Sequence, residues 1–173
     1  MLQVFQHLQR PSSSSAASAT AFFQGDPVEL FATGTIGVAA AGDTLLLGPL
    51  TGVFYTDAST SKPTFANHLD ASNTATDIVG FVSDDPYERF EVQADGATAA
   101  ADVGLNADIV YAAGSSPDYV SKVELDISDK KAGSAQLRMM GISKDPSNDT
   151  AGSANVNLVV MINEHFLKGT AGI

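Results

Sequence analysis

Residues 78–96 read Ile-Val-Gly-Phe-Val-Ser-Asp-Asp-Pro-Tyr-Glu-Arg-Phe-Glu-Val-Gln-Ala-Asp-Gly, and this stretch decides the fold class. It opens with a short run of β-branched and aromatic residues, which the Asp-Asp-Pro sequence interrupts. A second run then alternates, with Phe90, Val92 and Ala94 on one side and polar side chains between them. Such alternation predicts a strand that is buried on one face and solvated on the other. The stretch therefore predicts two strands joined by a loop, and its final Asp-Gly pair predicts a turn.

The same pattern of short apolar runs separated by turn residues continues along the chain. No segment of helix length shows helical periodicity. We count eight to ten short strands, which predicts an all-β fold, a sandwich or a barrel of short antiparallel strands. The last strand is apolar on both faces at its centre and is expected to be central in its sheet or covered by a neighbour. The candidate strands are 28–31, 35–39, 45–47, 53–55, 78–82, 90–94, 109–111, 123–127, 137–142 and 155–163.

The segment 55–76 is polar and is predicted to be a long surface loop. Loops of this length are uncommon inside a compact domain and are often functional. The segment also carries a few aromatic side chains among its polar ones, as interaction sites do. We therefore take Tyr55 and Phe65 as candidate partner-binding residues.

The first twenty residues have a different composition, with apolar residues near the start and then a run rich in Ser and Ala. The sequence therefore predicts a flexible N-terminal arm and tether over 1–20, followed by one β-rich domain over 21–173. The arm is too short to fold alone. It is either a disordered end or a docking peptide that becomes ordered on a partner. In the second case its apolar anchors are Leu2, Val4, Phe5 and Leu8.

The charge composition bears on the class of partner. The 173 residues include nine basic and twenty acidic side chains, for a formal net charge of −11. Nucleic-acid binding needs clustered Lys and Arg, but here the basic residues are scattered, apart from Lys130-Lys131. We therefore expect no direct nucleic-acid contact and an acidic surface that faces solvent. No run approaches the roughly 18 apolar residues of a membrane span, so no membrane partner is expected.

Motifs for catalysis, metals and cofactors were sought without success. There is no cysteine, the three histidines lack zinc-site spacing, and neither a Gly-x-Ser-x-Gly elbow nor a Gly-rich phosphate loop occurs. Acidic clusters at 84–85 and 145–149 have the oxygen ligands that calcium prefers, but Asp-Pro pairs more often form turns. The sequence therefore predicts no catalytic residue, no metal and no cofactor, with calcium at these two loops as the alternative.

Several stretches in order resemble the head decoration (capsid cement) proteins of tailed bacteriophages, particularly those of marine and cyanobacterial viruses. The resemblance covers roughly 21–166. The stretches are Phe-Phe-Gln-Gly-Asp-Pro-Val at 22–28, Gly-Thr-Ile at 34–36, Phe-Val-Ser-Asp-Asp-Pro at 81–86, Phe-Glu-Val-Gln-Ala-Asp-Gly at 90–96, Asp-Val-Gly-Leu-Asn-Ala-Asp at 102–108, and 155–166 ending in Ile-Asn-Glu-His-Phe.

The resemblance implies a small β-rich structural protein on the outer surface of an icosahedral phage head. It also implies a homotrimer that staples neighbouring subunits of the major capsid protein and has no enzymatic activity. A tail or fibre adhesin that binds receptors through 55–76 is the first alternative, and a hydrolase is the second. The number of copies per particle separates decoration from a tail position.

Overall fold

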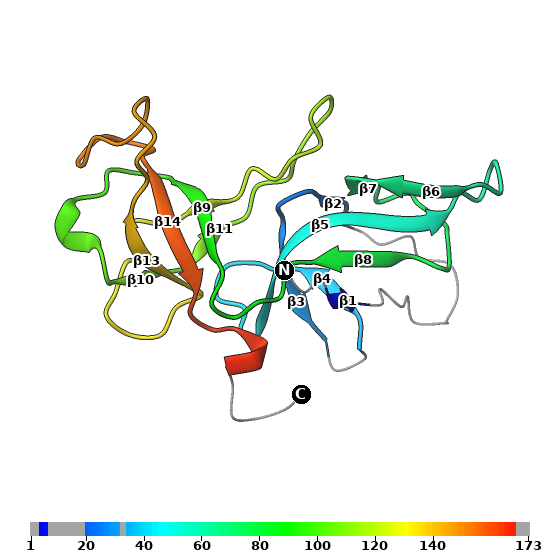
Figure 1. Cartoon of the computed structure of the whole chain (residues 1–173), viewed down its shortest axis with the longest axis horizontal. Coiled ribbons are helices and arrows are strands. Elements are labelled where there is room, and N and C mark those ends of the chain that lie inside the picture. Colours follow the sequence, from blue (N-terminus) through cyan, green and yellow to red (C-terminus); the bar gives the residue numbers. More distant parts are fainter. Residues whose placement is uncertain (1–3, 7–19, 32–33, 169–173) are drawn as a thin grey trace.

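The computed structural model describes residues 4–6, 20–31 and 34–168, and within these ranges the chain is all-β. Fourteen strands form two six-stranded sheets and one two-stranded sheet, with two short 3-10 segments and no α-helix in the described ranges. The all-β prediction is confirmed, although the expected number of strands was too low. Figure 1 shows two lobes side by side along the longest axis, strands β1–β8 in one and β9–β14 in the other.

The first lobe is built around one long strand, β5, which pairs with three others. Its first half pairs antiparallel with β3, and its second half lies between β6 and β8. β4 continues the sheet beyond β3, β1 continues it beyond β8, and β2 pairs separately with β7. The strands are β1 (Val4–Gln6), β2 (Phe22–Phe23), β3 (Pro27–Leu30), β4 (Ile36–Val38), β5 (Leu46–Thr56), β6 (Pro63–Ala66), β7 (His68–Leu69) and β8 (Val79–Val82).

The second lobe is a nearly closed, barrel-like sheet in the order β10-β13-β14-β9-β12-β11. Its two outermost strands follow each other in the chain with only Asp108 between them, so one stretch of backbone closes the sheet. All pairings are antiparallel except β9 with β12, which is parallel. The elements are β9 (Arg89–Ala94), η1 (Ala100–Asp102), β10 (Asn106–Ala107), β11 (Ile109–Val110), β12 (Glu124–Leu125), β13 (Leu137–Ile142), β14 (Asn157–Ile162) and η2 (Phe166–Lys168).

Two predictions about the second lobe are confirmed. Along β9 the apolar side chains of Phe90, Val92 and Ala94 are less exposed than the polar ones between them. β14 lies between β13 and β9, where its apolar residues are covered as expected. Each lobe thus has a core of its own, because alternating strands bury one face each.

The separate strands expected at 45–47 and 53–55 are wrong, because both belong to the continuous strand β5. Gly48-Pro49, which reads as a turn, lies within this strand. A Cβ at Gly48 would come within 1.8 Å of the Ser83 carbonyl oxygen, so glycine permits a close backbone approach here. The pairing of β5 with β8 shifts register between Leu50 and Gly52, as at a β-bulge.

The long loop expected at 55–76 is also wrong, since this segment contains β6 and β7. β6 forms a hairpin with the end of β5. Asp57 closes the connecting turn by accepting hydrogen bonds from the Ser59 and Thr60 amides, at 3.0 and 2.7 Å. The polar residues of the segment lie mainly in 57–62 and 70–77, outside the two short strands.

The junction between the lobes is held by backbone and side-chain hydrogen bonds. The Leu46 amide donates to the Glu164 carbonyl oxygen over 2.9 Å, and the Leu46 side chain belongs to the core of the second lobe. The buried Gln136 side chain donates to the carbonyl oxygens of Ala40 and Asp43, at 2.8 and 3.0 Å. The same side chain accepts the Ile109 amide at 3.0 Å, so one residue ties both lobes together.

Candidate interaction surface

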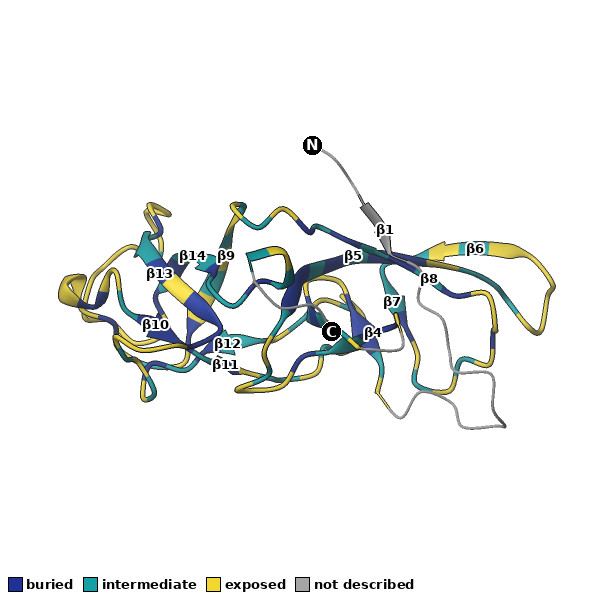
Figure 2. Cartoon of the chain, turned by 90° about the horizontal axis from the view of Figure 1, so that it is seen from below, coloured by how far each residue is buried: buried dark blue, intermediate teal, exposed yellow. Residues whose placement is uncertain are grey.

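The outer face of the sheet β6-β5-β8 carries large apolar side chains, two of which, Phe54 and Phe65, are exposed. Phe54 on β5 is the register partner of Phe65 on β6 and of Val79 on β8, so the three side chains share one face. Phe65 is 67% exposed and Phe54 is 36% exposed. We call Phe54, Phe65, Val79 and Phe81 the aromatic face; Figure 2 shows β6 as an exposed strand beside β5.

The aromatic side chains on this face pack across the strands. The ring centroids of Phe65 and Phe81 are 5.4 Å apart with the rings tilted at 44°. A Cβ at Gly52 would come within 3.0 Å of the Phe65 ring, so glycine on β5 lets that ring lie across the strand toward Phe81. The sheet thus holds its exposed rings in defined positions, which lowers the entropic cost of burying them against a partner.

Carboxylates border the aromatic face near the β5–β6 hairpin. Asp77 accepts hydrogen bonds from the Thr56 hydroxyl at 2.6 Å and the Thr56 amide at 3.0 Å, and these bonds hold the pKa of Asp77 below its ordinary value. Hydrogen bonds from the Thr60 amide and hydroxyl similarly lower the pKa of Asp57. The apolar centre therefore has an anionic border, which suits a partner with an apolar patch and basic side chains beside it.

The structure places the predicted site residues on different surfaces. Phe65 lies on the aromatic face, whereas Tyr55 is half-buried and packs against the core on the opposite side of the sheet. Val4 and Phe5 belong to β1, whose backbone pairs with β8 in the register Val4 to Val82 and Phe5 to Phe81. Leu2 and Leu8 lie outside the described residues.

Sequence reasoning missed Phe54 and Phe81 as members of this surface. Residues alternate between the two faces of a strand, so recognising β5 as one strand places Phe54 on the face opposite to Val53 and Tyr55. Phe81 could not be placed beside Phe65 without knowing that β6 and β8 flank β5. The contact between Phe65 and Phe81 depends on the order of the strands in the sheet, and the local sequence carries no signal for that order.

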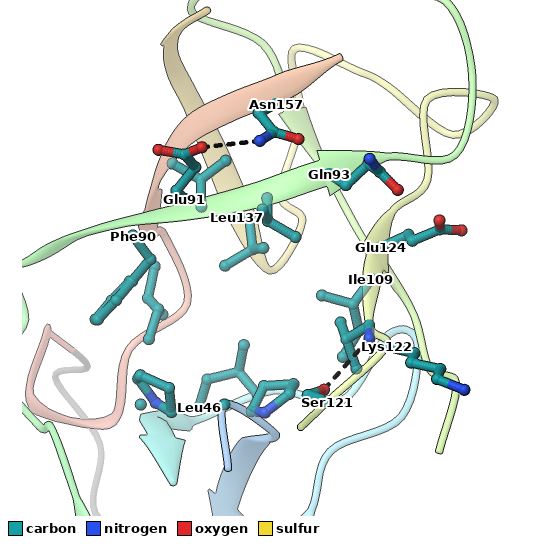
Figure 3. A pocket seen from close by; sticks show the side chains of 18 of the residues that line it. Leu46, Phe90, Glu91, Gln93, Ile109, Ser121, Lys122, Glu124, Leu137 and Asn157 are labelled. Carbon is teal, nitrogen blue, oxygen red and sulfur yellow. Dashed lines mark hydrogen bonds between the residues drawn. The ribbon is translucent and has the colours of Figure 1, made fainter. Parts of the chain in front are cut away.

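A pocket of about 970 Å³ lies where the barrel-like sheet faces the β3–β5 region. Its centre is lined by apolar side chains, including Leu46, Phe90, Ile109 and Leu137 (Figure 3). On the rim, the Asn157 amide donates to Glu91 at 2.9 Å, and Lys122 points away from the centre and bonds Ser115. The centre of the pocket is thus apolar, and charged side chains, including Arg89 and Glu124, lie among the residues that line it.

The two acidic clusters form turns, as predicted. Asp85 accepts the Tyr87 amide at 2.9 Å, and Asp145 accepts the amide and hydroxyl of Ser147 at 2.9 and 2.8 Å. In the described part of the chain no group of three or more His, Cys, Asp or Glu side chains is arranged to hold a metal ion.

The two histidines in the described ranges have structural contacts. His68 stacks on Tyr119 with ring centroids 3.8 Å apart, and buried His165 accepts the Leu167 amide at 3.0 Å. His7 lies outside the described residues.

Within the described ranges, no helix is both long enough and apolar enough to cross a membrane. Comparisons with known protein families, with curated proteins and with solved structures give no match.

Proposed function

We propose that this chain is a structural protein of the outer surface of a tailed-phage head. In this role it binds the major capsid protein, assembles as a homotrimer and staples neighbouring capsid subunits. The aromatic face is the observation that carries the proposed docking, and the resemblance of residues 21–166 to head decoration proteins supplies the identity of the partner. The net charge of −11 suits an outer position, because packaged DNA repels an acidic protein.

The aromatic face has the properties of a docking surface. Exposed apolar patches with polar borders are typical of interaction sites in soluble proteins. Burying two partly exposed Phe rings contributes about 1–3 kcal/mol each in a well-packed contact. Such a contact is modest by itself.

Stapling then works by mass action. A protein that binds the assembled shell, and not its separated subunits, stabilises the shell. The stabilisation increases with the protein's affinity for the shell and with its concentration. A copy that bridges two subunits must be released before they part, and many copies act together. No covalent chemistry is needed for this effect.

The test is a binding assay on heads stripped of this protein. The variant Phe54→Ser with Phe65→Ser is expected to bind about 100-fold more weakly than the wild type, because two aromatic anchors are lost. Tyr87→Ser is the matched control, since Tyr87 is 74% exposed and lies outside the aromatic face. Equal binding by the double variant and the control would remove the aromatic face from the contact.

The number of copies tests the position on the particle. Decoration predicts hundreds of copies per particle, whereas a handful of copies at the tail would favour the adhesin alternative. Quantitative mass spectrometry of purified particles, with the major capsid protein as internal reference, gives this number.

A further inference from the structure

β8 is an edge strand apart from its contact with β1. It pairs with β5 on one side, and on the other side the described residues that pair with it are the three of β1, in the register Val4 to Val82, Phe5 to Phe81 and Gln6 to Gly80. Without β1, the outward N–H and C=O groups of β8 would be free to pair with another extended chain.

Within the described residues, the pairing of β1 with β8 is short. Three residues form few backbone hydrogen bonds, and each bond must offset the entropy of ordering a chain end. Fifteen residues, 7–21, connect β1 to β2. At about 3.3 Å per residue a chain of this length spans at most about 50 Å, which is enough to reach an adjacent molecule.

Charge complementarity favours binding of this segment to the body of the protein. Residues 1–25 contain Arg10 and no Asp or Glu, whereas residues 26–173 contain the other eight basic residues and all twenty acidic ones. Acidic residues lie near both ends of β8 in the sequence, with Asp77 before Ile78 and Asp84-Asp85 after Ser83. The arm therefore carries a formal charge of +1 from Arg10, whereas residues 26–173 carry a formal net charge of −12.

We propose that β1 exchanges between copies, so that the strand Val4–Gln6 of one molecule pairs with β8 of a second copy of this chain. The β8 edge is identical in every copy, so the same hydrogen bonds form within one chain or between two. When two copies lie next to each other, the arm of one copy has a high effective concentration at the β8 edge of the other, which favours pairing between chains. Each exchanged arm then links two molecules beside the aromatic face, because Phe5 is the register partner of Phe81.

The test uses the absence of native cysteine, which makes any disulfide an introduced one. A chain with Phe5→Cys is mixed with a differently tagged chain carrying Phe81→Cys in a glutathione redox buffer. Directly opposite residues in an antiparallel pair have the spacing that a disulfide needs. We expect the mixed-tag disulfide in at least about tenfold excess over the matched control, Phe5→Cys with Val79→Cys, in which the second cysteine is two residues out of register.

Two results would overturn the proposal. In one, the double variant Phe5→Cys with Phe81→Cys closes a disulfide within a single chain and the mixture gives no more product than the control, so the arm stays on its own copy. In the other, neither experiment yields the in-register disulfide, so the arm does not pair with β8 at all. Both experiments use purified protein, so either result leaves binding to heads as a separate question.

A second measurement avoids any cysteine on β8. Phe5→Pro removes a backbone donor and disfavours a paired strand. In sedimentation, we expect the wild type and Ser13→Pro, a variant in the connecting segment, to associate as the concentration rises, and we expect Phe5→Pro to remain monomeric. Unchanged association in Phe5→Pro contradicts the exchange.

Discussion

Asp26 and Gln136 are buried polar residues beside the lobe junction, and their environments differ. The Asp26 carboxylate accepts the Phe23 amide at 2.9 Å, but burial raises its pKa above the ordinary value, and the Phe23 amide and Ser121 only partly oppose this. Gln136 is neutral and has a partner for both ends of its amide. Asp26 therefore destabilises the fold to an extent that depends on pH, whereas Gln136 stabilises it.

Asp26→Asn is expected to raise the free energy of unfolding by about 1 kcal/mol at pH 7. A carboxyl with a raised pKa in the folded state destabilises the fold when ionised, and this cost fades as the pH falls toward about 3.9. The gain from Asn should therefore shrink between pH 7 and pH 4. Urea unfolding at both pH values measures the difference, and an equal gain at both pH values, or no gain at pH 7, would contradict it.

Gln136→Leu is expected to lower the free energy of unfolding by about 3 kcal/mol. The change leaves the Ile109 amide and the carbonyl oxygens of Ala40 and Asp43 without this partner in a buried site. Gln93→Leu is the control, because Gln93 is exposed on β9 and its loss should matter by less than about 0.5 kcal/mol. Similar losses for both variants would show that Gln136 does not hold the junction.

At the scale of elements, β5 is the strand that organises the first lobe, and glycines allow its neighbours to approach. Gly48→Ala should destabilise the protein by more than about 2 kcal/mol, since its Cβ would overlap the Ser83 carbonyl oxygen. Gly133→Ala is the matched control, because a Cβ there meets nothing within 4 Å. Thermal unfolding of both variants is the measurement, and a Gly48→Ala protein as stable as the control would contradict the packing described.

The sequence predicts a strand correctly where the hydrophobic pattern of that strand alone indicates its conformation. The alternation in β9 and the doubly apolar centre of β14 gave the correct conformation and the correct burial. The patterns failed in β5 and β6, where Gly48-Pro49 and Pro63-Thr64 look like turn or loop residues but are held in strands by pairing.

The candidate surface could be predicted only in part. The aromatic ring of Phe65 in a polar segment identifies it as a candidate from the sequence. Its neighbours Phe54 and Phe81 come from strands 11 and 16 residues away in opposite directions, and only the sheet order brings them together. Tyr55 is a candidate from the sequence because it too is an aromatic residue beside polar ones. Its position in β5 nevertheless turns its side chain toward the core.

At the scale of the whole molecule, His165 links the C-terminal segment to β5 through an isolated β-bridge with Leu46. Burial, with a smaller contribution from the Lys168 ammonium, lowers the pKa of His165. A lowered pKa in the folded state means that stability is intact above the unfolded value of about 6.5 and is lost as the pH falls below it.

The free energy of unfolding should therefore fall between pH 7 and pH 5, by at most about 1.4 kcal/mol per pH unit from this residue. His165→Asn keeps an acceptor for the Leu167 amide and removes the titration, so its unfolding free energy should depend less on pH in this range. Chemical unfolding at several pH values measures both slopes. Parallel slopes for the wild type and His165→Asn would assign the pH dependence to another group.

We propose that this molecule acts by non-covalent docking of its aromatic face on a viral shell. A cryo-EM map of the source particle is the decisive measurement. We expect hundreds of copies on the outside of the head, with Phe54, Phe65 and Phe81 buried against the shell or an adjoining copy. A map with a few copies at the tail, or with the aromatic face turned to solvent in every copy, would contradict the claim.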